Sequence, residues 1–221
     1  MAEKKVIGID EVGTGAWAGP FFVCAVTVDS SWLISGLRDS KELDKTKIEQ
    51  MHDLLTADPR VKWHISTRSP AEIDELHLGK ALSQAWVEAG RKAMLQAPNA
   101  RVFLDGGRRP PDPCAADWIV MPNADAHVPC VMAAAIIAKH LRDSWMKEQA
   151  VLYPAYGFES NVGYGTEQHL EALNAHGVCP IHRKSFKPVK RVLERGLIPP
   201  EDAGVHEVTS ELYSSWKKRS A

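Results

Sequence analysis

The chain has 221 residues, enough for one large domain or for one domain with an appendage. Hydrophobic residues make up 44% and charged residues 25%, which is typical of a globular protein and excludes a disordered or collagen-like chain. The formal net charge of −1 excludes the globally basic surface of many nucleic-acid-binding proteins, so a polyanionic partner would need local clusters of cations or metal ions.

The cysteines and the N-terminus indicate a cytoplasmic protein. The four cysteines are far apart and form neither a Cys-x-x-Cys pair nor a zinc-site spacing with histidine: Cys24, Cys114, Cys130 and Cys179. The first predicted strand begins within six residues of the N-terminus, which leaves no room for a signal peptide. No apolar run reaches the roughly 18 residues of a membrane span, so we expect no membrane contact.

The stretch from Val6 to Pro20 is the most informative. Residues 6–9 are typical of a buried strand, which ends at the adjacent acids Asp10 and Glu11. A glycine loop follows, with glycines at Gly13, Gly15 and Gly19, and residues 21–28 form a second apolar run. Acids at a strand end beside such a loop place oxygen ligands near backbone that a substrate can approach, which favours metal-assisted chemistry. The alternative is a simple hairpin with surface acids at its tip.

Two nucleotide-binding interpretations of this glycine loop fail. A P-loop would need a lysine for the phosphates, and here that lysine is missing and two carboxylates lie within the motif. A dinucleotide fingerprint would lead into a helix, whereas these glycines lead into a strand-like run.

The next segments alternate between predicted helices and strands. A helix is predicted from Asp39 to about Leu55, capped by Asp39 or Ser40, with Glu42 completing a capping box. Lys41 would then be a cation in the first turn, where the helix dipole disfavours it, and a nearby phosphate would explain its presence. A strand is predicted over residues 61–66 and a helix over residues 71–94.

Two further acids occupy informative positions. Asp105 ends an apolar strand at residues 101–105, and parallel strands would bring it to the same sheet edge as Asp10, although a turn role is the alternative. A short strand over residues 118–121 precedes a helix from about residue 128 to 149. Its face carries Met132, Ile136, Lys139 and Asp143 at intervals of four, three and four. The alternative for Asp143 is a surface pair with a neighbouring lysine.

The last third of the chain is rich in aromatic and basic residues. Tyr164 lies in a glycine-rich loop and is either a loop anchor or a stacking platform, and Thr166 caps a helix to about His176. A basic cluster then includes Arg183, with Ser185 as a further phosphate contact; a solvated surface is the alternative. Residues 199–221 follow a Pro-Pro pair and show a helical stripe.

These motifs together resemble ribonuclease HII, a type 2 ribonuclease H. The matching segments span roughly residues 6–191 in family order: GIDEVGTGAWAGP, DSKEL, EIDELHLGKAL, FLDGG, AAAIIAKHLRD, YPAYGF, GYGTEQHL and CPIHRKSF. The resemblance implies an α/β fold with a ribonuclease H-like mixed β-sheet flanked by helices. It implies a catalytic domain over residues 1–198 and a helical tail over residues 199–221 packed on that domain.

The resemblance also implies an activity and its residues. The activity would be endonucleolytic cleavage of the RNA-containing strand of an RNA/DNA hybrid, or of duplex DNA with embedded ribonucleotides, 5′ to the ribonucleotide. A carboxylate site would bind two Mg²⁺ or Mn²⁺ ions through Asp10, Glu11, Asp105 and Asp143. Gly13, Thr14, Gly15 and Tyr164 match positions that recognise the ribose, and Ser40, Lys41, Arg183 and Ser185 are the expected phosphate contacts. We expect a monomer.

Departures from the family pattern leave alternatives open. Thr14 stands where the family usually has arginine, and Ala16-Trp17 replaces a usual Pro-Leu. Losing the arginine removes a phosphate-directed cation, so cleavage at a single ribonucleotide is in question and a ribonuclease HIII-like preference for hybrids is an alternative. A non-cleaving hybrid-binding module and a different metal-dependent nuclease or phosphatase are the remaining ones.

Overall fold

The computed structural model describes residues 4–37, 39–41 and 43–196, which fall into two compact units. The first unit takes residues 1–12, 22–67 and 82–141, and the second takes 13–21, 68–81 and 142–221. The expected C-terminal helix lies outside the described residues, as does the domain boundary at residue 198, which stays a prediction.

The first unit is built on a five-stranded sheet in the order β3-β2-β1-β4-β5. The strands are β1 (Lys5–Val12), β2 (Phe21–Asp29), β3 (Lys62–Arg68), β4 (Arg101–Asp105) and β5 (Ile119–Met121). β1 pairs antiparallel with β2 and parallel with β4, and β4 is parallel to β5. The mixed sheet of an α/β fold is therefore confirmed. The antiparallel β1–β2 pair also agrees with the hairpin interpretation of this stretch.

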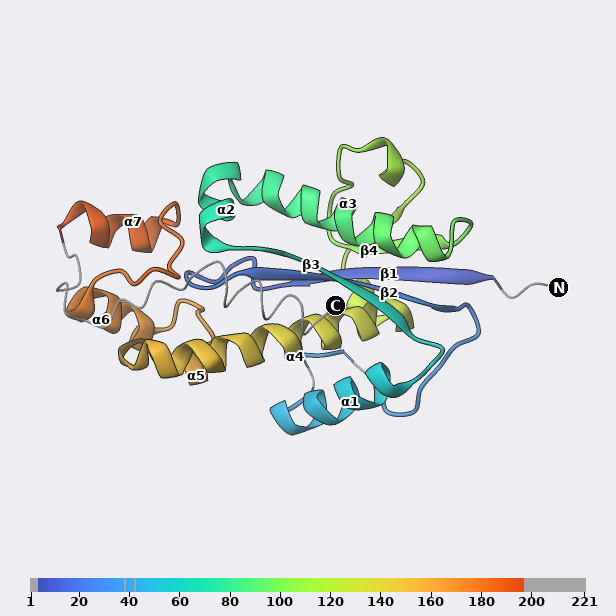
Figure 1. Ribbon diagram of the computed structural model, residues 1–221, viewed down its shortest axis with the longest axis horizontal. Coiled ribbons are helices and arrows are strands. Elements are labelled where there is room, and N and C mark those ends of the chain that lie inside the picture. Colours follow the sequence, from blue (N-terminus) through green and yellow to red (C-terminus); the bar gives the residue numbers. More distant parts are fainter. Residues whose placement is uncertain (1–3, 38, 42, 197–221) are drawn as a thin grey trace. The chain divides into compact units, whose positions relative to one another are not determined.

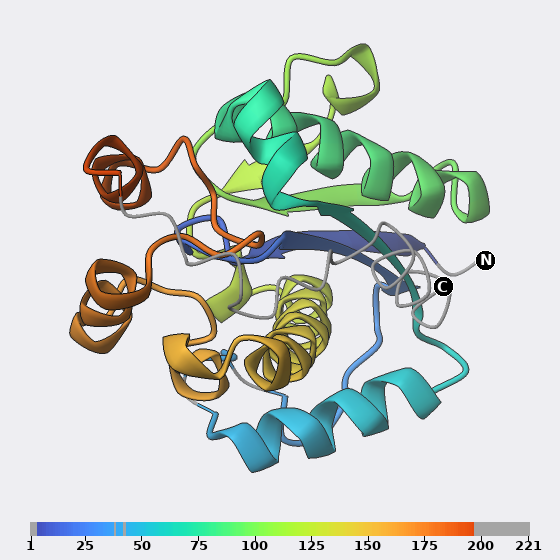
Figure 2. The ribbon, with the colours of Figure 1, turned by 60° about the vertical axis from the view of Figure 1, so that its left-hand side comes forward.

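Helices cover both faces of this sheet. Figures 1 and 2 show α3 on one face and α4 on the other, with α1 on the outer side of α4. A Cβ on Gly8 would overlap the backbone of Cys130 at the start of α4, whereas a Cβ on Gly90 of α3 would meet Trp118 and Ile9. Side chains alternate along a strand, so Asp10 shares the α4 face with Gly8 and Glu11 shares the α3 face with Ile9.

Three predicted boundaries differ from the structure. β1 continues to Val12, so the two acids lie inside the strand near its end. The first helix begins at Lys45, and its cap is Asp44, whose side chain accepts from the Lys47 N–H, so the predicted cap at Asp39 or Ser40 is wrong. Asp39 instead accepts the Lys41 backbone N–H at 2.9 Å, a turn that ends before the helix.

The predicted helix over residues 71–94 is two helices. His77 separates them with φ of +62°, a left-handed conformation that interrupts the helical hydrogen bonds. Apolar spacing continues across this break, which is why periodicity alone joined the two segments. The helices of the structure are α1 (Lys45–Ala57), α2 (Pro70–Leu76), α3 (Leu78–Gln96), α4 (Pro129–Leu152), α5 (Phe158–Asn161), α6 (Glu167–His176) and α7 (Lys187–Glu194), with short 3₁₀ turns η1 (Pro113–Ala115), η2 (Ala124–Ala126) and η3 (Pro154–Tyr156).

The second unit has a core of stacked and edge-on rings. Tyr156 stacks on Phe158 with centroids 5.4 Å apart, and both rings lie against His169 and His182. Thr166 caps α6 by accepting the His169 N–H, as predicted. The four cysteine thiols are free. Among the described helices, none has the length and apolar character needed to cross a bilayer.

Candidate active site

Two of the predicted acids end adjacent parallel strands. The register between β1 and β4 pairs Ile9 with Leu104, and the next residues along the two strands are Asp10 and Asp105. Asp10 is 6% exposed, and one of its carboxylate oxygens accepts the Glu11 N–H at 2.7 Å. Asp105 is half-buried and accepts the Ala124 N–H at 2.7 Å. The predicted meeting of strand-end acids at one sheet edge is therefore confirmed for this pair.

Glu11 belongs to the same group although its side chain leaves the opposite face of the strand. Its Oε2 accepts a hydrogen bond from the indole Nε1 of Trp86 on α3, at 2.9 Å. The bend that was expected to redirect Glu11 is absent, because β1 stays regular through Val12. We call Asp10, Glu11 and Asp105 the strand-end acids.

Their electrostatics show how crowded with negative charge this edge is. Burial raises the pKa of Asp10 well above its usual range, and the charges of Glu11 and Asp105 raise it further. Burial and the same kind of repulsion raise the pKa of Glu11 to about 7, against the Trp86 hydrogen bond that lowers it. The pKa of Asp105 is raised mainly by burial and then by the charge of Asp125, against the Ala124 hydrogen bond that lowers it. A cation at this edge would relieve this repulsion.

Asp125 is a fifth acid of the edge that sequence reasoning missed. It lies in η2, is 3% exposed, and accepts the Lys41 ammonium on one oxygen at 2.6 Å. Its charge adds to the repulsion on all three strand-end acids. Lys41 has a 68% exposed side chain, and the hydrogen bond to Asp125 raises the pKa of its ammonium. The adjacent Ser40 is buried.

The donor set at this edge suits a hard divalent cation. All the candidate ligands are carboxylate oxygens, which Mg²⁺ and Mn²⁺ prefer, and their mutual repulsion is the charge that such an ion would offset. Within the described part of the chain, no three acidic, histidine or cysteine side chains already form a group that could hold a metal ion. Glu11 and Asp105 are instead bound to protein N–H donors. Metal binding here therefore stays a prediction.

The fourth predicted acid, Asp143, lies in the second unit. It is half-buried on α4, directly after Arg142, in the part of that helix that the second unit contains. Its role as a metal ligand also stays a prediction.

The glycine loop, residues 13–20, is held from inside the second unit by two buried arginines. Arg183 donates to the carbonyls of Gly13, Thr14 and Gly19 at 2.7, 2.9 and 2.8 Å. Arg142 donates to three more carbonyls, those of Ala18, Pro20 and Val162. Both side chains are 0% exposed, and burial lowers the pKa of each guanidinium, that of Arg183 to about 9. Gly13 has φ of +86°, and a Cβ there would overlap Arg142.

Arg183 therefore supports the loop. Its three donor nitrogens point to loop carbonyls, and none of the described contacts leaves it facing solvent. The predicted contact between this side chain and the substrate is not tested by these bonds and stays a prediction.

Tyr164 lies beside the glycine loop in the same unit. Its ring is 37% exposed, lies with its centroid 5.2 Å from the Arg142 guanidinium, and would be 4.0 Å from a Cβ on Gly15. Its backbone is fixed, because its carbonyl accepts from His169 Nδ1 at 2.9 Å. His182 Nδ1 accepts the Cys179 N–H, so its Nε2 carries the proton that bonds His169 Nε2 at 3.0 Å. Both histidines are neutral, since burial lowers their pKa values, that of His182 to about 3.

The basic cluster after residue 180 does not share one environment. His182 and Arg183 are buried, whereas the Ser185 hydroxyl is exposed and donates to Asp74 at 2.6 Å. Asp74 also accepts the backbone N–H groups of Lys184 and Ser185, so this turn is tied to α2. The predicted phosphate contact of Ser185 stays a prediction.

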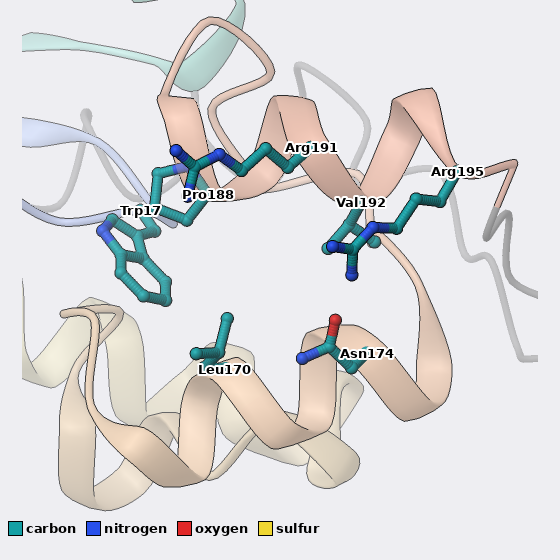
Figure 3. A pocket seen from close by; sticks show the side chains of 7 residues that line it. All are labelled: Trp17, Leu170, Asn174, Pro188, Arg191, Val192 and Arg195. Carbon is teal, nitrogen blue, oxygen red and sulfur yellow. The ribbon is translucent and has the colours of Figure 1, made fainter.

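A groove of about 490 Å³ lies between α6 and α7 of the second unit. Figure 3 shows Trp17 of the glycine loop at one end, Leu170 on the α6 side, and Arg191 and Arg195 on the α7 side. The remaining lining residues are Asn174, Pro188 and Val192. The groove explains why Arg191 does not join the buried arginines: it belongs to an open surface.

Comparison with known proteins agrees with this arrangement. The sequence model described as Ribonuclease HII matches residues 7–189. A ribonuclease HII of Bacillus cereus (strain Q1) is 40% identical over 190 residues, which cover 86% of this chain and 72% of that protein. The fold is similar to ribonuclease H2 from Pyrococcus horikoshii OT3 (TM-score 0.70, 24% identity, 86% of this chain and 98% of that one). It is also similar to Bst-RNase HIII in complex with Mn²⁺ (TM-score 0.67, 20% identity, 87% and 70%). Since the family model covers most of the sequence and the relative shares its full fold-bearing length, this chain belongs to the ribonuclease HII family.

Proposed function

We propose that this protein cuts the RNA-containing strand of RNA/DNA hybrids and of duplex DNA with embedded ribonucleotides, on the 5′ side of the ribonucleotide. Ribonuclease HII enzymes are metal-dependent endoribonucleases, so the class of reaction follows from family membership. The site of cleavage, the 3′-hydroxyl and 5′-phosphate products, and the identity of the ligands are the proposal.

One observation carries it: three buried or half-buried carboxylates gather where β1 and β4 end, and the glycine loop begins two residues after Glu11. A cluster of acids of like charge destabilises a protein unless it has a use for cations. We infer that Asp10, Glu11, Asp105 and Asp143 hold two divalent ions. Bound there, Mg²⁺ or Mn²⁺ would lower the pKa of the attacking water and stabilise the leaving 3′-oxygen.

The chain's own residues would place the substrate. The carbonyls of the glycine loop are tied back to Arg183 and Arg142, which favours a rigid backbone near the ribose. Backbone groups of residues 13–15 can approach a 2′-hydroxyl closely because Gly13 and Gly15 carry no side chain. Tyr164, exposed beside Gly15, would stack on the neighbouring sugar. Lys41 would contact the phosphate backbone, with Ser40 behind it.

The proposal is tested by cleavage of labelled duplexes that contain one, four or all ribonucleotides, in Mg²⁺ or Mn²⁺. We expect Asp10→Asn to lower the rate by more than about 100-fold, because a ligand of the ions is lost. The matched control is Asp29→Asn, at the far end of the β1–β2 pair, which should leave the rate unchanged. Calorimetric titration with Mn²⁺ should show weaker binding to the Asp10 variant only. Cleavage by Asp10→Asn at the wild-type rate would refute the site.

Thr14 sets the substrate range of this proposal. The family usually has arginine there, so we expect this chain to cut a single ribonucleotide more slowly than a tract, and Thr14→Arg to narrow the difference. The measurement is the ratio of kcat/KM for the one- and four-ribonucleotide duplexes. Equal rates on both duplexes would show that Thr14 does not limit cleavage.

A further inference from the structure

The ion pair between Lys41 and Asp125 joins an exposed cation to a buried acid. The Nζ–Oδ2 distance is 2.6 Å, and the two side chains are 68% and 4% exposed. Ordinary surface pairs of this protein, such as Lys190–Glu194 at 3.9 Å with both side chains above 60% exposure, look quite different. The asymmetry means that solvent, or a ligand, can reach the ammonium while the carboxylate stays enclosed.

Asp125 is placed where an acid is costly. It is 3% exposed, and it lies near enough to Asp10, Glu11 and Asp105 for its charge to repel each of theirs. Its second oxygen, Oδ1, is buried and has no hydrogen-bond partner. An acid retained only to stabilise the fold would be expected to bond with both oxygens, because a buried unsatisfied acceptor costs about 1–3 kcal/mol. The described contacts therefore leave the hold on Lys41 as the main task of this side chain.

Lys41 in turn is held by nothing else that fixes its ammonium. Its backbone N–H donates to Asp39, and that turn sets where the side chain starts, whereas Asp125 sets where it ends. The result is a single positive charge kept beside the strand-end acids and open to solvent.

We propose that Asp125 is a positioning residue that holds the Lys41 ammonium at the edge of the strand-end acids, ready to pass to a phosphate of the cleaved strand. This rests on the proposed function, since the phosphate is that of the ribonucleotide-containing duplex. The exchange replaces one carboxylate–ammonium bond by one phosphate–ammonium bond and needs no proton transfer.

The two side chains should then affect different steps. Lys41→Met removes the phosphate contact. We expect the affinity for a labelled RNA/DNA hybrid in EDTA to fall about 3–10-fold, and the slope of log K against log salt to decrease by nearly one. Asp125→Asn leaves the ammonium in place but unguided. We expect the affinity and salt slope to stay close to wild type, and kcat for cleavage in Mg²⁺ to fall about 5–20-fold.

The double variant decides between positioning and simple structural support. If Asp125 acts through Lys41, the Lys41→Met/Asp125→Asn protein should cut no more slowly than Lys41→Met alone, because the second change has nothing left to position. Lys41→Arg should retain most activity only while Asp125 is present. Independent, multiplying losses in the double variant, or a salt slope unchanged by Lys41→Met, would overturn the proposal.

A second ion pair gives the matched control. Lys5 and Asp29 are also 2.7 Å apart, across the β1–β2 pair at the end remote from Asp10. Lys5→Met and Asp29→Asn make the same changes of charge and should leave kcat and the salt slope unchanged. Urea unfolding of every variant excludes loss of fold, and Asp125→Glu replaces Asp125→Asn if the latter unfolds. Wild-type protein that cuts no ribonucleotide duplex refutes the proposed function, whereas active wild type with additive variants refutes only the role of Asp125.

Discussion

Replacing Arg183 should destabilise the protein far more than replacing an exposed neighbouring cation. Its guanidinium is 0% exposed and donates to three loop carbonyls at 2.7–2.9 Å. Arg183→Met leaves these three acceptors without that partner, and each such loss costs about 1–3 kcal/mol. The desolvation of the buried cation is recovered at the same time, so the net loss should be about 3–5 kcal/mol of unfolding free energy. Arg183→Lys keeps the charge but can reach at most one or two carbonyls, and we expect about 2–4 kcal/mol.

The assay is urea unfolding followed by circular dichroism, with Lys184→Met as the control. Lys184 is the next residue along the chain and its side chain is exposed, so its loss should change the unfolding free energy by less than about 0.5 kcal/mol. Variants that remain folded at low temperature should also lose affinity for the hybrid, because the glycine loop is no longer tied back. A loss below about 1 kcal/mol for Arg183→Met would show that the loop keeps its shape without this side chain and would refute the reasoning.

Three further predictions concern the second unit. Gly13→Ala should cost about 1–2 kcal/mol for its left-handed backbone alone, and more from overlap with Arg142; equal urea midpoints would contradict this. Tyr164→Ala should raise KM for ribonucleotide duplexes by a factor that corresponds to about 1 kcal/mol without changing the urea midpoint, and an unchanged KM would remove the ring from the substrate site. His182 has a folded pKa of about 3, below its unfolded value, so the unfolded chain binds more protons between pH 6.5 and pH 3 and stability falls as the pH falls through that range. The unfolding free energy of wild type should therefore decrease with falling pH by up to about 1.4 kcal/mol per unit more steeply than that of His182→Gln, and parallel curves would exclude this histidine as the cause.

The sheet edge could be predicted because its information is local. An apolar run that ends in an acid marks the end of a buried strand, and the rule that parallel strands share an edge then brings Asp10 and Asp105 together. The same rule says nothing of Glu11, whose position depends on Trp86, a residue 75 positions later. A tertiary hydrogen bond of this kind leaves no periodic signal.

Asp125 and Arg183 were misjudged for related reasons. Asp125 lies in a three-residue 3₁₀ turn, too short for any hydrophobic period, and only its pairing with Lys41 reveals it. The one available sign was Lys41 itself, a cation in a place where a helix start would disfavour it. Arg183 stands among exposed basic residues in the sequence, and burial of a guanidinium by backbone carbonyls cannot be read from composition.

The anchored backbone of Tyr164 has a consequence for how its ring meets a ligand. Its N–H donates to the Asn161 carbonyl, its own carbonyl accepts from His169 and from the Thr166 N–H, and the ring rests over Arg142 while 37% of the residue stays exposed. Little rotational freedom is left to be lost on association, and immobilising a free side chain of this size would cost about 0.5–1.5 kcal/mol. The tyrosine is thus preorganised, and because both histidines behind it stay uncharged around neutral pH, that preorganisation should be independent of pH in the range where the protein works.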